Sequence, residues 1–113
     1  MPDPAPSRFH CPWLGHEVEL TSERELHIEV RHPDLLPRHR IRLAEVLAEP
    51  DLIRRSSRSS SIVLFSRWYT DVGQGRHIVV VVVDKSRAPA RSWILTAYTA
   101  LRIGGGEVLW QRG

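Results

Sequence analysis

Two pairs of polar side chains stand at strand spacing in the C-terminal half of the chain. Arg67 and Tyr69 are two residues apart, and so are Thr96 and Tyr98. Side chains two positions apart on a strand point to the same face. If both pairs share one face, a cation and several hydroxyls gather in a patch that can hold a phosphate and stabilise a pentavalent transition state. The alternative is a half-exposed sheet face that uses Thr and Tyr because both favour strands.

His27 is the candidate for proton transfer beside that patch. It lies in the stretch Glu25-Leu26-His27-Ile28, and imidazole is the side chain best suited to moving protons near neutral pH. RNA cleavage without a metal needs a base that takes the proton of the 2′-hydroxyl and an acid that protonates the leaving 5′-oxygen. His27 would supply one of the two, unless it is a helix histidine that only packs or caps.

Positive charge is concentrated in the middle of the chain. Residues 31–58 hold seven arginines against four carboxylates, an excess of three that equals the formal net charge of +3. The planar guanidinium group binds phosphate through paired hydrogen bonds, and a basic region beside a sheet is typical of nucleic-acid binding. We expect Arg38, Arg40, Arg54 and Arg55 to contact RNA phosphates, although an ordinary basic helix surface explains the same charge.

Other chemistries have little support in the sequence. His10, Cys11 and His16 do not match a zinc spacing, and the glycines at 104–106 lack the Lys-Ser/Thr of a phosphate-binding loop. We therefore expect neither a metal nor a cofactor. The chain has one cysteine, no signal-peptide core and no apolar stretch that could span a bilayer, which predicts a cytoplasmic protein without membrane contact.

Local signals also predict the helices that must position these groups. Ser22 followed by Glu25 fits a capping box and predicts a helix over residues 23–31, although alternating apolar residues in the same stretch also fit a strand. A second helix is expected over 38–48, before a proline that ends it.

The strands are expected mainly after the helices. The expected ranges are a short strand at 17–20 and longer ones at 62–69, 78–84, 93–98 and 107–110. The valine-rich run at 78–83 is typical of a buried central strand. The composition predicts a flexible N-terminal arm over residues 1–15 and one domain over 16–113. We expect an α+β domain with two N-terminal helices packed on one face of a curved antiparallel sheet of about four strands.

In order and spacing, several short motifs resemble a known family. These motifs are Glu-Arg-x-x-His-Ile (23–28), Arg-His-Pro-Asp-Leu (31–35), Glu-Pro-Asp-Leu-Ile (49–53), Leu-Phe-Ser-Arg-Trp-Tyr (64–69), the valine run, Leu-Thr-Ala-Tyr (95–98) and Gly-x-x-x-Trp (106–110). The family comprises the phage- and mobile-element-associated nuclease-like domains of the barnase–EndoU–colicin–RelE fold, and the similarity covers roughly residues 16–111.

The resemblance implies metal-independent RNA cleavage by helices packed on a curved antiparallel sheet. It also implies the residues of the site, namely His27 from the His-Ile motif, Arg67 from the strand, and Thr96 with Tyr98 from the Thr-Ala-Tyr motif. Many relatives are described only as predicted nucleases, so catalysis is inferred by analogy.

The leading hypothesis is an RNA endonuclease, or toxin-type ribonuclease, that works by 2′-hydroxyl attack and leaves a 2′,3′-cyclic phosphate. Arg67 would hold the scissile phosphate, Thr96 would position it, and His27 would be the base or the acid with Tyr69 or Tyr98 as its partner. The expected partners are RNA, such as tRNA or mRNA, and a cognate antitoxin or immunity protein. The alternatives are a non-catalytic RNA- or protein-binding module of a mobile element or toxin–antitoxin system, and a purely structural domain.

Overall fold

The computed structural model describes residues 5–85 and 90–113 of the chain. The described residues form seven strands and two helices. In chain order these are β1 (Ser7–Cys11), β2 (His16–Leu20), α1 (Ser22–Arg31), α2 (Arg40–Ala48), β3 (Leu52–Arg55), β4 (Ile62–Tyr69), β5 (Arg76–Lys85), β6 (Arg91–Ala100) and β7 (Glu107–Gln111).

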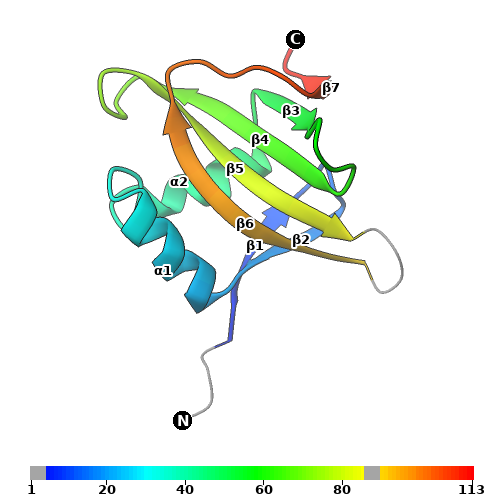
Figure 1. Cartoon of the computed structure of the whole chain (residues 1–113), viewed down its shortest axis with the longest axis horizontal. Helices are drawn as coiled ribbons and strands as arrows, with labels where there is room; N and C mark the ends of the chain where they lie inside the picture. Colours follow the sequence, from blue (N-terminus) through cyan, green and yellow to red (C-terminus); the bar gives the residue numbers. More distant parts are fainter. Residues whose placement is uncertain (1–4, 86–89) are drawn as a thin grey trace.

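The strands join into one mixed sheet with the order β1-β2-β6-β5-β4-β3-β7 (Figure 1). Neighbouring strands are antiparallel, except that β2 and β6 run parallel and pair at Glu19 and Trp93. The prediction of an antiparallel sheet of about four strands is therefore wrong. Two short strands, β1 and β3, were missed, and the parallel pair brings the N-terminal hairpin into the same sheet.

Part of the predicted N-terminal arm belongs to this sheet. Ser7–Cys11 form β1 and pair with β2 from Ser7 opposite Leu20 to Cys11 opposite His16. The Cys11 side chain is buried in the core. Residues 1–4 of that arm lie outside the described residues.

The valine-rich strand β5 is central, as predicted. It lies between β4 and β6, and Ile78–Val82 are buried on both faces of the sheet. A strand with both faces covered reads as a continuous apolar run instead of an alternating one, which explains why the sequence signal was clear.

Both predicted helices are present. Thr21, rather than Ser22, is the N-cap of α1, and its hydroxyl oxygen accepts the backbone N–H of Arg24 at 3.2 Å. Acidic residues in the first turn and Arg31 in the last turn suit the helix dipole. These end signals decide for a helix over the alternating-strand alternative.

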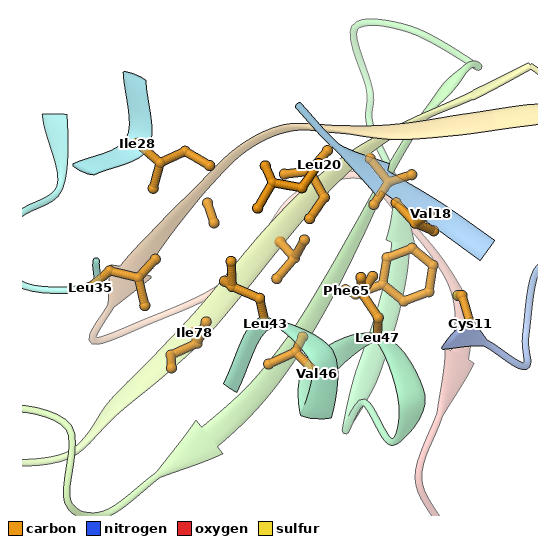
Figure 2. Packing of buried hydrophobic residues seen from close by; sticks show 14 of the residues in the cluster. Cys11, Val18, Leu20, Ile28, Leu35, Leu43, Val46, Leu47, Phe65 and Ile78 are labelled. Atoms are coloured by element: carbon orange, nitrogen blue, oxygen red, sulfur yellow. The ribbon is translucent and has the colours of Figure 1, made fainter. Parts of the chain in front are cut away.

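The core lies between α2 and one face of the sheet, and α1 adds Ile28 to it. Figure 2 shows Leu43, Val46 and Leu47 of α2 directed toward strand residues that include Phe65 and Ile78. The segment that joins β6 to β7 has to pass β5, β4 and β3, and it does so on the opposite face, where Arg54 donates to the carbonyl oxygens of Gly104 and Gly105. No helix in the described ranges is long and apolar enough to cross a membrane.

Candidate functional site

The two predicted polar pairs lie on opposite faces of the sheet. Phe65, Val80 and Ala97 are in register across β4, β5 and β6, and all three belong to the core beneath α2. Arg67 and Tyr69 follow Phe65 in steps of two and share its face, whereas Thr96 and Tyr98 flank Ala97 and point the other way. The expected single patch of these four side chains is therefore wrong.

Arg67 and Tyr69 instead join a cluster of carboxylates beside α2. The Tyr69 hydroxyl donates to Glu45 at 2.8 Å, and an Arg67 nitrogen lies 3.9 Å from the Glu49 carboxylate. Burial, and next the bond to Glu45, raise the pKa of Tyr69 well above its ordinary value, so its phenol stays protonated. Arg67 and the neighbouring Arg42 are thus paired with the carboxylates of Glu49 and Asp71, so a phosphate here would have to compete with carboxylates that are already in place.

Thr96 and Tyr98 lie where β6 borders α1. The pairing of β2 with β6 stops at Trp93, so within the described residues the later part of this β6 edge meets the helix and not a strand. An Arg24 nitrogen on α1 donates to the backbone carbonyl of Leu95 at 3.3 Å. At the other end of the helix, the rings of His32 and Tyr98 lie 6.2 Å apart.

His27 lies on the same flank of α1 as two arginines. Residues three, four and seven apart stack along a helix, so Arg24, His27 and Arg31 form one stripe beside the β6 edge. The stripe lines a shallow hollow of about 300 Å³ together with Glu23, Leu26 and Val30. The residues that line this hollow all belong to α1, and the contacts of this part of the chain with β6 include those of Arg24 with the Leu95 carbonyl and of His32 with the Tyr98 ring.

The four arginines expected to bind RNA phosphates do not form one track. Arg38 is exposed between the helices, while Arg40 bonds to Glu25 and Ser7. Arg54 is only 5% exposed, and Arg55 follows it on the opposite face, with a buried Nε that has no hydrogen-bond partner among the described residues. These four arginines are close in the sequence, but the folded chain does not bring them together.

Sequence reasoning missed His77 and Trp68, which pair across β4 and β5 on the same face as Tyr98. Their rings meet edge to face, with centroids 4.8 Å apart. Burial is the main cause that lowers the pKa of His77; Asp51 opposes this effect and Arg54 adds to it. The sequence could have revealed this pair. If the predicted strand had begun at Arg76 instead of Ile78, His77 would have been expected opposite Trp68.

His16, Ser92 and Asp84 also meet but do not form a hydrolytic triad. The Ser92 hydroxyl donates to Asp84 at 2.6 Å and accepts from His16 Nε2 at 2.7 Å. A triad carboxylate must hold the other ring nitrogen, and Ser92 is only 1% exposed. This network joins β2, β5 and β6. No group of three or more His, Cys, Asp or Glu side chains that could hold a metal occurs in the part of the chain that is described.

Comparison of the chain with protein-family models, with curated proteins and with solved structures finds no match in any of the three. The functional argument therefore depends on the residues of this chain.

Proposed function

We propose that this protein binds and cleaves RNA at the seam between α1 and β6, by 2′-hydroxyl attack and without a metal. The observation that carries the proposal is the bond from Arg24 to the Leu95 carbonyl. It supports a site in which the stripe Arg24, His27 and Arg31 lies beside the face that displays Thr96 and Tyr98. The motif resemblance of residues 16–111 motivates the reaction class, and the geometry narrows the set of residues.

Phosphate binding is assigned to Arg24 and Arg31, with the Thr96 hydroxyl as a further donor. Only one carboxylate, that of Glu23, lines the hollow beside this stripe, and it is 87% exposed to solvent and 3.9 Å from Arg24. Its attraction for Arg24 is therefore weak. In contrast, Arg67 faces Glu49 on the other side of the sheet, so the scissile phosphate is not assigned to it.

In the proposed step the 2′-oxygen forms a bond to phosphorus as the bond from phosphorus to the 5′-oxygen breaks. His27 takes the proton of the 2′-hydroxyl, and the Tyr98 phenol gives a proton to the leaving 5′-oxygen. The products are a 2′,3′-cyclic phosphate and a 5′-hydroxyl. Solvent returns a proton to Tyr98 and removes one from His27, which restores the site.

The test is cleavage of labelled RNA by purified protein in the presence of a chelator. We expect His27→Ala and Tyr98→Phe each to slow cleavage by at least about 100-fold, with melting temperatures near that of the wild type. His10→Ala is the matched control, because His10 is an exposed histidine on β1, and it should cleave normally. Arg67→Ala should also retain most activity, which separates this site from the one first expected.

Equal cleavage by the wild type and by His27→Ala would mean a contaminant and would overturn the proposal. Salt-sensitive RNA binding that persists in His27→Ala, with no turnover by either protein, would instead favour the non-catalytic RNA-binding module.

A further inference from the structure

Three rings line up across the sheet face that carries Tyr98. Trp68 on β4 pairs with His77 on β5, and His77 pairs with Ala100 on β6. Tyr98 stands two residues before Ala100 on the same face, so it is a diagonal neighbour of His77, at a distance of about 7–8 Å. The row Trp68–His77–Tyr98 therefore runs obliquely across the strands, since Tyr98 is directly opposite Val79, and it ends at α1, where the His32 and Tyr98 rings lie 6.2 Å apart.

Trp68 is held firmly although it is 42% exposed. Its backbone N–H donates to the Asp51 carboxylate at 2.8 Å, and the His77 ring supports the indole edge to face. Gly75 packs against it so closely that a Cβ at that position would lie 2.8 Å from the indole carbon Cζ2. An aromatic ring that is fixed before binding loses little entropy when a ligand stacks on it.

Arginines flank the Tyr98 end of the row, where Arg24 and Arg31 lie on α1. Arg54 lies on the same face of the sheet, but it is 5% exposed and donates to the carbonyl oxygens of Gly104 and Gly105, so it is not assigned to a backbone phosphate. Aromatic rings beside cationic groups are what single-stranded nucleic acid requires, because the backbone follows the positive charge while the bases stack on the rings. Bases paired in a duplex are already stacked and cannot use such rings.

We propose that the row Trp68–His77–Tyr98 is a stacking platform for unpaired bases, so that the RNA recognised by this protein is single-stranded. The inference rests on the proposed function and specifies the substrate class of the same site. It adds Trp68 as a binding residue that takes no part in proton transfer.

The test measures binding of a short labelled RNA, alone or annealed to its complement, in the His27→Ala background so that turnover does not interfere. We expect the single strand to bind more tightly than the duplex. Adding Trp68→Ala should weaken single-strand binding about 5- to 150-fold, and Trp68→Phe should recover much of the loss. Trp110→Ala is the matched control, since Trp110 is 39% exposed at the far end of the sheet.

Several outcomes would overturn the inference. These are tighter binding of the duplex, no binding of either RNA, an equal effect of Trp68→Ala and Trp110→Ala, or loss of thermal stability in Trp68→Phe as well as in Trp68→Ala. Cleavage separates the two proposals. If the wild type cleaves RNA but Trp68→Ala does not weaken RNA binding, only the platform is refuted. If binding depends on Trp68 but the wild type does not cleave RNA, only the catalytic assignment is refuted.

Discussion

Arg42 on α2 binds the carboxylate of Asp71 in the β4–β5 loop through both of its terminal nitrogens. The Nη1–Oδ1 and Nη2–Oδ2 distances are 2.6 and 2.5 Å, and the same guanidinium lies over the Tyr69 ring, 4.6 Å from its centroid. This bidentate arrangement is the most specific contact between arginine and a carboxylate. One of the seven arginines of residues 31–58 is thus committed to holding a loop on a helix.

The first prediction concerns acid stability. The hydrogen bonds from Arg42 are the main cause that lowers the pKa of Asp71 from 3.8 to about 2. A carboxylate whose folded pKa is depressed adds stability above its unfolded pKa, and this is lost as the pH falls through the folded value. The difference in free energy of unfolding between wild type and Asp71→Asn should therefore be constant above the ordinary value and shrink as the pH falls towards about 2.

Chemical denaturation across this acid range measures that difference. A gap that stays unchanged down to the folded pKa would contradict the prediction. Salt should narrow the gap at neutral pH, because the pair is near the surface.

The second prediction separates two of the three consecutive glycines. Gly106 has φ +72°, and a Cβ there would overlap the carbonyl oxygen of Arg55, whereas Gly104 has nothing within 4 Å. Gly106→Ala should lower the free energy of unfolding by about 2 kcal/mol or more, while Gly104→Ala should change it little. Urea unfolding of the two variants makes the comparison, and equal effects would show that the chain crosses the sheet differently.

The third prediction concerns the buried Ser92 network. Ser92→Ala removes the acceptor of His16 and the donor to Asp84, which leaves two polar groups without this partner. We expect a loss of about 1–3 kcal/mol in the free energy of unfolding. Ser57→Ala, at an exposed loop position, is the control and should be neutral. A neutral Ser92→Ala would mean that water replaces the hydroxyl at no cost.

The fourth prediction concerns the reactivity of Cys11. Burial raises the pKa of this thiol, and its side chain is 0% exposed, so little thiolate is present and reagents cannot reach it. A disulfide reagent should modify the native protein far more slowly than the denatured protein, at a rate that rises with denaturant. Rapid native modification would place β1 outside the sheet for much of the time.

The elements with strong local signals were predictable. α1 begins at a cap within one residue of the predicted one, at Thr21 instead of Ser22, and the valine run of β5 is apolar enough to be recognised without its neighbours. β1 and β3 lacked such signals, because β1 lies in the stretch whose composition predicted a flexible arm, and β3, Leu-Ile-Arg-Arg, does not alternate between apolar and polar residues. Both form strands because a neighbouring strand offers its backbone for pairing. β1 pairs with β2, and β3 pairs with β4 and β7.

The candidate site also has a part that the sequence predicted and a part that it did not predict. Residue spacing was sufficient to predict that Arg67 shares a face with Tyr69 and that Thr96 shares a face with Tyr98. Which faces these pairs occupy depends on strand register, and a change of one residue moves every side chain of a strand to the other face. The register of β4, β5 and β6 arises from pairing between distant segments and from packing under α2. Only the folded chain, therefore, separates Arg67 from Tyr98 and places His77 and Trp68 on the same face as Tyr98.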